Sequence, residues 1–158
     1  MKEQAIALFA NYGQEIVFLH VLSAIIWIGG MIVIRLAVHP TIQTIEEPRI
    51  RLGKTLALMG KFFNIVLPFI LLLLLTAIIL IFAMGKSPAI EMKENIWMLM
   101  AANFTWMYFK RQKAQKLFDE GKLPKAKAVV ALIPRILLPL NILLGLLALW
   151  LGIGLRGL

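Results

Sequence analysis

His20 is the residue of this chain that is best placed to do chemistry. It lies within an apolar run from residue 16 to residue 38, which only His20, Ser23 and Arg35 interrupt. A polar side chain inside a run that can cross a bilayer is energetically costly, so it is a functional candidate. In a helix, positions three, four, seven and eleven residues further on share one face. We therefore expect a face that looks into a helix bundle and consists of His20, Ser23, Ala24, Trp27 and Met31.

Three methionines are the candidate metal ligands to accompany His20. Met84 ends a second apolar run, Met98 lies in a third, and Met92 lies between the two. Spans that run in opposite directions would bring Met84 and Met98 to the depth of His20. An imidazole with thioethers is a soft site that suits Cu(I), and a His/Met pair can also hold a heme iron. The alternative is packing alone, since His can bond a carbonyl and Met fills gaps in a core.

Two further residues are candidates for binding a heme together with His20. Trp27 lies near the middle of the first run, where its ring can pack against a porphyrin or fill the bundle. Arg135 lies at the start of the last apolar run, where a guanidinium either snorkels or meets an anion such as a heme propionate. His39 is excluded from a shared site, because 19 residues of helix separate it from His20 by roughly 28 Å.

Helical spans must position these residues. Of the 158 residues, 61% are hydrophobic and 16% are charged, which is too apolar for a soluble domain. A helix of about 20 residues crosses the hydrocarbon core. We predict an all-α fold in which residues 1–158 form one membrane domain, a polytopic four-helix bundle. Its predicted spans are about 16–38, 62–84, 94–110 and 129–152, of which the third is short.

The basic residues predict the orientation of these spans. Twelve of the 17 Lys and Arg residues lie in or beside the segments 39–61 and 110–128. Cytoplasmic loops carry such an excess, so we expect both segments to be cytoplasmic loops and both termini to lie on the outer, periplasmic side. The net charge of +9 then reflects topology and attraction to anionic lipids, and not nucleic acid. The lipid bilayer is the expected partner.

Turn residues and small residues predict where the helices end and where they touch. Glu46-Glu47-Pro48 is typical of a helix start, whereas residues 85–88 and 120–124 contain the Gly and Pro of turns. Small residues that recur on one helix face permit the close approach of a neighbour. Gly29-Gly30 supplies small residues in the first span. The last span has a stripe of them, which consists of Asn141, Gly145, Ala148 and Gly152.

Four motifs together resemble those of the small four-span membrane proteins of the copper-resistance D (CopD-like) family. They are L-H-x6-W-x-G-G at 19–30, the basic segment leading to Lys61-Phe62-Phe63, the D-E-G-K-L-P turn at 119–124 and the I-P-R-I-L-L-P-L-N stretch at 133–141. The resemblance implies a protein of the bacterial inner membrane that binds or transports copper. The first motif is similar, in weaker form, to one in HemJ-type membrane proteins, which bind heme.

Three hypotheses about function remain open at this point. The first is copper handling, with ligands from His20, Met84, Met92 and Met98. The second is a heme-b protein of electron transfer or oxidation and reduction, with His20 as an axial ligand and Met98, or His20 of a second copy in a homodimer, as the other. The third is a membrane assembly subunit without a cofactor. No triad, phosphate loop or pair of carboxylates is recognisable, so no catalytic residue is predicted.

Overall fold

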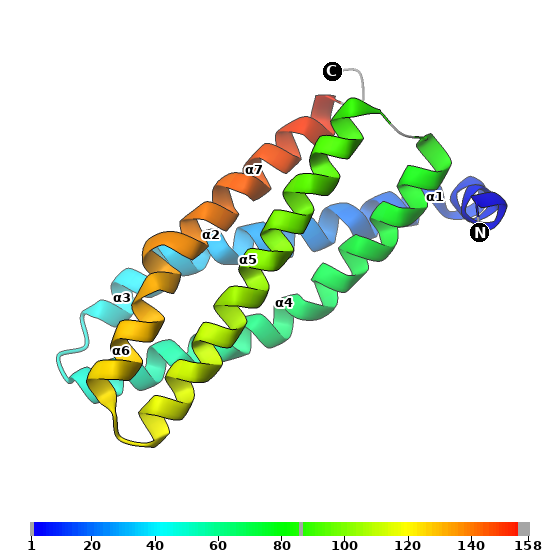
Figure 1. Ribbon diagram of the computed structural model, residues 1–158. Helices are drawn as coiled ribbons and strands as arrows, with labels where there is room; N and C mark the ends of the chain where they lie inside the picture. Colours follow the sequence, from blue (N-terminus) through cyan, green and yellow to red (C-terminus); the bar gives the residue numbers. More distant parts are fainter. Residues whose placement is uncertain (1, 86, 155–158) are drawn as a thin grey trace.

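Four stretches of helix, joined by short turns, make up the structure (Figure 1). The computed structural model describes residues 2–85 and 87–154, and these contain no β-strand, which confirms the predicted all-α class. The first stretch, Lys2–Gln43, comprises α1 (Lys2–Ala24), the π-helical η1 (Ile25–Gly29), α2 (Gly30–Val33), the π-helical η2 (Ile34–Val38) and α3 (His39–Gln43). It is followed by α4 (Pro48–Met84), α5 (Pro88–Asp119) and a last stretch of α6 (Leu123–Leu132), the π-helical η3 (Ile133–Leu137) and α7 (Leu138–Gly154).

Three of these stretches are long and apolar enough to cross a membrane. Among the described residues they are Lys2–Gln43, Pro48–Met84 and Leu123–Gly154. Helix α5 has 32 residues, but charged side chains near both of its ends make it less apolar than the others. It packs against α4, α6 and α7 and is therefore part of the same bundle.

The helices end where the sequence predicts. Helix α4 begins at Pro48, which follows the extended backbone of Glu47, and it stops at Gly85, whose φ of +83° favours glycine. The Ser87 hydroxyl caps α5 by accepting a hydrogen bond from the Ile90 amide at 3.3 Å. Gly121, with a φ of +75°, turns the chain toward α6. The predicted helix start and both predicted turns are thereby confirmed.

The segments 39–61 and 110–128, predicted to connect the spans, are largely helical, and the first of them includes the predicted helix start at Pro48. Within these two segments, only residues 44–47 and 120–122 have non-helical backbone. The bundle core continues past the apolar runs, because Leu52, Leu56 and Met59 of α4 are buried there, as are Ala114 and Ala126. Hydropathy detects only the apolar part of a helix, whereas packing between helices extends these helices beyond it.

Regular α-helix is interrupted at two places in the outer stretches. Tyr12 in α1 has non-helical angles (φ −132°, ψ 28°), and in Figure 1 the beginning of α1 turns away from the rest of the bundle. In the last stretch η3 lies just before Pro139, and the Leu138 amide donates to the carbonyl of Ile133, five residues back. Pro139 lacks an N–H, so the Arg135 carbonyl loses its usual helical donor at this point.

An amide bridge ties α5 to the last stretch. The Asn103 side-chain amide donates to the Leu137 carbonyl and to Asn141 Oδ1, both at 2.8 Å, and the Asn141 amide donates to the Met100 carbonyl at 3.3 Å. Asn141 is fully buried, so these bonds satisfy a side chain that would otherwise be costly.

The small-residue stripe of the last span is a close helix contact, as predicted. A Cβ on Gly145 would stand 2.7 Å from Ile28 Cγ1 of η1. In the first span, the predicted close approach of a neighbouring helix is found at Gly30 but not at Gly29. A Cβ on Gly30 would stand 2.6 Å from Phe62, whereas one on Gly29 would meet nothing within 4 Å.

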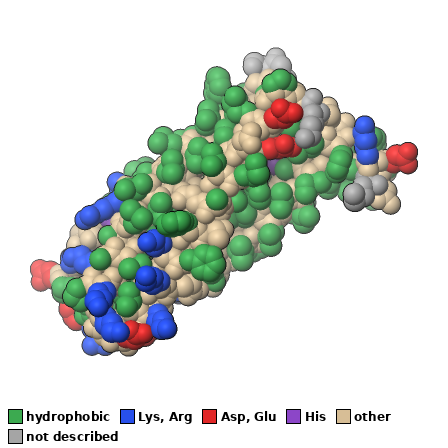
Figure 2. All heavy atoms as spheres, viewed as in Figure 1, with side chains coloured by type: hydrophobic (Ala, Val, Ile, Leu, Met, Phe, Trp, Pro, Cys, Tyr) green, Lys and Arg blue, Asp and Glu red, His purple; other side chains and the backbone are tan. Residues whose placement is uncertain are grey.

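Charge is concentrated at one end of the bundle. In Figure 2 the blue Lys and Arg side chains gather at the end where α5 meets α6, while hydrophobic side chains cover the middle. The beginning of α1 and the end of α7 lie toward the opposite end (Figure 1). We call these the basic end and the opposite end.

Candidate functional site

The helix face that begins at His20 points into the bundle, as predicted. Ser23, Trp27 and Met31 expose at most 1% of their surface, and Ala24 is also buried. His20 itself is half-buried, at the contact between α1 and α4. The Ser23 hydroxyl donates to its own helix, at the Leu19 carbonyl, over 2.7 Å. His20 is therefore the polar group of this face that reaches a neighbouring helix.

The partner of His20 is Thr76 of α4. His20 Nδ1 lies 2.9 Å from Thr76 Oγ1, which itself lies 2.8 Å from the Leu72 carbonyl and 3.0 Å from the Leu73 carbonyl. A helical Thr hydroxyl commonly gives its one proton to a carbonyl three or four residues back, and in that arrangement Thr76 Oγ1 accepts from His20. Nδ1 then carries the ring proton. Nε2 of the neutral imidazole is left with a lone pair, which is the state that binds metals.

Lys93 of α5 lies on the same side of the bundle. Its ammonium nitrogen lies 3.0 Å from the position that a Cβ on Gly152 of α7 would take. Gly152 lies near the level of His20, because Gly145 meets Ile28, which follows His20 by eight residues, and α7 runs in the opposite direction to the first stretch (Figure 1). This level is nearer the opposite end than the basic end.

The three predicted thioether ligands are not in the core beside His20. Met84, Met92 and Met98 expose 58%, 51% and 55% of their surface. The depth predicted for Met84 was wrong, because Thr76 occupies the level of His20 on α4 and Met84 lies eight residues, or about 12 Å, further along. The buried methionines are others, namely Met31, Met59, Met100 and Met107.

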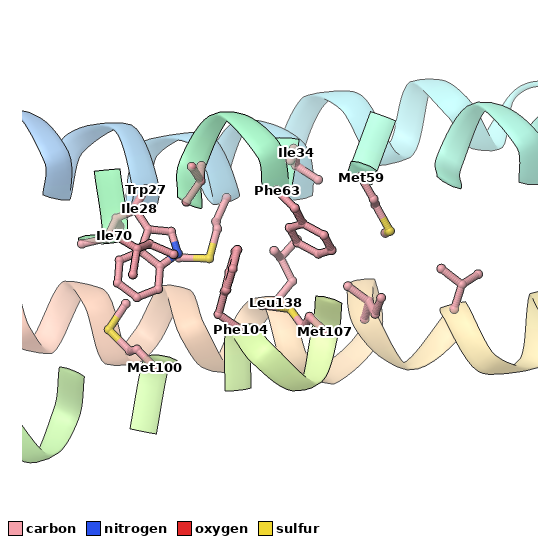
Figure 3. Close-up of a cluster of buried hydrophobic side chains, with 14 of the residues drawn as sticks. Trp27, Ile28, Ile34, Met59, Phe63, Ile70, Met100, Phe104, Met107 and Leu138 are labelled. Atoms are coloured by element: carbon pink, nitrogen blue, oxygen red, sulfur yellow. The ribbon is translucent and has the colours of Figure 1, made fainter. Parts of the chain in front are cut away.

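Trp27 is a core residue. Its ring meets that of Phe104 edge to face, with 6.0 Å between centroids, and Phe104 in turn meets Phe63 at 5.2 Å. Figure 3 shows these rings among the buried side chains between the helices. The indole Nε1 is buried and has no hydrogen-bond partner within the described residues.

Arg135 and His39 lie far from His20. Arg135 is exposed in η3 and precedes Gly152, at the level of His20, by 17 residues, which is roughly 26 Å of helix. A heme bound to His20 would therefore not bring its propionates to Arg135. His39 begins α3, and its Nε2 lies 3.5 Å from the Gln43 side chain. It takes no part in the His20 site, as the sequence predicts.

Sequence reasoning missed Thr76, although a signal for it exists. Between Asn64 and Gly85, Thr76 is the one residue with a polar side chain. A lone hydroxyl in an apolar span is a candidate partner for a lone imidazole in another. Helix pairing and register were needed to join the two.

Comparisons with known proteins do not extend this picture. In the described ranges, 2–85 and 87–154, no group of three or more His, Asp or Glu side chains is arranged to hold a metal ion. Protein-family models, curated proteins and solved structures were all searched, and none of them matches this chain.

Proposed function

We propose that this chain is a four-span protein of the bacterial inner membrane that handles copper, with His20 as a ligand on the periplasmic side. The observation that carries the proposal is the 2.9 Å contact between His20 Nδ1 and Thr76 Oγ1. With the ring proton on Nδ1, Nε2 is available to donate its lone pair to a metal within a membrane helix. The CopD-like motifs in the sequence point to the same cargo.

The span that this proposal adds to the three long apolar stretches is residues 94–110 of α5, the third in chain order. One side of this segment is buried in the bundle through Ile96, Met100, Phe104 and Met107. Its other side exposes the large apolar side chains of Leu99, Trp106 and Phe109. A surface of this kind is costly in water and is suited to lipid. The 17 residues rise roughly 25 Å, which a locally thinned core accommodates.

The orientation in this proposal places the basic end in the cytoplasm. The chain contains no Cys, so single cysteines report on topology without further engineering. We expect Ser87→Cys, between α4 and α5, to react with an impermeant thiol reagent in intact cells. Lys116→Cys, near the end of α5, should react only after lysis. The reverse pattern would contradict the orientation.

Copper would need ligands besides His20, and the methionines are the proposed source. Met84, Met92 and Met98 all lie toward the end of α4 or in the first part of α5. Because their side chains are exposed and unbranched, they are free to reorient. Thioethers and a neutral imidazole together favour Cu(I) over harder cations.

Heme b is the alternative cargo for the same nitrogen. An iron ligated by His20 Nε2 would take Met98, or His20 of a second copy, as its other axial ligand. Arg135 has no place in this alternative, because it lies too far along the bundle. The third hypothesis, an assembly subunit without a cofactor, needs no metal or heme iron bound to Nε2.

Metal analysis and an absorption spectrum separate these three functions. The protein is purified in mild detergent from cells supplied with copper and heme. We expect stoichiometric copper and no Soret band. A Soret band with little copper would support the heme alternative instead. Protein that holds neither copper nor heme would contradict both and leave the assembly role.

A further inference from the structure

A groove at the basic end lies between α4 and α5, far from His20. Its volume is about 480 Å³, and it is hollowed between the first half of α4 and the second half of α5. The polar residues that line it are Lys61, Asn64, Tyr108, Arg111 and Gln112. No Asp or Glu is among its lining residues. Hydrogen-bond donors and positive charge therefore dominate the groove, which favours an anion.

Arg111 is held in place at the floor of this groove. Its Nε donates to the Leu56 carbonyl at 3.2 Å, and its terminal nitrogens donate to the side chains of Gln112 (3.4 Å) and Gln115 (3.1 Å). These bonds use three of the five N–H groups of a guanidinium. The two others, one on each terminal nitrogen, make none of these bonds and can donate to a ligand, and guanidinium groups bind phosphates well.

Gly60 makes room for this guanidinium. A Cβ at position 60 would stand 2.5 Å from Arg111 Nη2 and 2.8 Å from Cζ. Any larger residue would therefore displace the guanidinium from the groove. Because the displaced atoms are the far end of a flexible side chain, the helices themselves would not have to move.

The groove lies where lipid headgroups would be in the proposed membrane placement. Lys61 directly precedes the apolar run 62–84, and Arg111 directly follows the span 94–110. Toward the middle of the bundle, Ile65 of α4 and Phe109 of α5 expose 59% and 65% of their surface. A ligand with an anionic head and apolar tails would meet hydrogen-bond donors at the groove and apolar side chains on the side toward the middle of the bundle.

We propose that this α4–α5 groove binds the phosphate group of an anionic phospholipid. Arg111 and Lys61 supply the charge, and the Tyr108 hydroxyl and the Asn64 amide supply neutral donors. The proposal rests on the membrane placement but not on any role of His20. Protein that holds no copper could therefore still bind lipid in this groove, and protein that binds no lipid there could still hold copper.

The test is the thermal stability of the purified full-length protein in detergent, measured against added lipid. We expect phosphatidylglycerol to stabilise the protein at lower concentrations than phosphatidylcholine with the same acyl chains. Phosphatidylcholine carries the same phosphate but adds a cation, which Lys61 and Arg111 repel. Inorganic phosphate at the same concentration is the third arm. If it stabilises as well as the lipid does, the groove takes free phosphate and the lipid assignment is overturned.

Variants assign the effect to the groove. Arg111→Gln and Lys61→Gln should each raise the phosphatidylglycerol concentration for half-maximal stabilisation, by about tenfold for Arg111, because charge-assisted hydrogen bonds are lost. Gly60→Ala should raise it by at least about threefold without changing any charge. The controls are Lys113→Gln, which removes an exposed charge outside the groove, and Gly29→Ala, whose methyl group meets nothing. Variants that respond to the lipid just as the controls do would overturn the proposal.

Discussion

Replacing His20 by alanine is expected to abolish copper binding. His20 Nε2 is the ligand atom that the hydrogen bond to Thr76 presents, and the described residues hold no cluster of His, Asp and Glu that could take its place. The measurement is copper content per chain after purification. If the protein carries heme instead, the same variant should lose its Soret band. Retention of either cargo by His20→Ala would contradict the assigned ligand.

His39→Ala is the matched control for this variant. It also removes an imidazole, but from a residue roughly 28 Å of helix away, so the cargo should stay bound.

Thr76→Val tests the tautomer of His20. It keeps the shape of the side chain and removes the acceptor of the Nδ1 proton, so affinity should fall roughly 10- to 100-fold. Unchanged affinity in Thr76→Val would show that Thr76 does not orient the ligand.

The sequence predicted the local structure well because that structure depends on local chemistry. The start at Pro48 and the turns at Gly85 and Gly121 follow from residues with restricted or unusual backbone preferences. The buried face from His20 to Met31 follows from helical periodicity. Each of these features is decided within a few residues of sequence.

The candidate site was predicted less well because it depends on how the helices meet. An apolar residue that faces lipid cannot be told from one in the core by its type, so Met98 and Met100 appeared equivalent in the sequence. Counting residues from the end of a span placed Met84 at the level of His20. The packing of α1 on α4 places Thr76 there instead.

The helices extend beyond the predicted spans for a related reason. Hydropathy identifies the part of a helix that is suited to lipid. It does not detect a helix that continues beyond its apolar run. Leu56 and Ala126 are completely buried in these continuations, among many Lys and Arg residues. Burial there comes from contact between helices, which the sequence of a single helix does not show.

Replacing Gly145 by leucine is expected to cause the largest loss of stability of any substitution considered for this chain. The new Cβ alone would stand 2.7 Å from Ile28 Cγ1, 2.9 Å from Ile28 Cδ1 and 3.2 Å from Met100 Cε. Ile28 and Met100 are themselves buried, so neither can move aside without displacing its own neighbours.

Overpacking of this kind costs about 1 to 3 kcal/mol, which is a large part of the stability of a small bundle. Thermal unfolding in detergent is the measurement, and a marked fall in the melting temperature is expected for Gly145→Leu. Gly29→Leu is the matched control, because it adds the same side chain at a glycine whose Cβ would meet nothing within 4 Å. Its melting temperature should stay close to that of the wild type. Equal melting temperatures for the two variants would mean that η1 and α7 are not in contact at Gly145, and the register of the first and last stretches would have to be assigned anew.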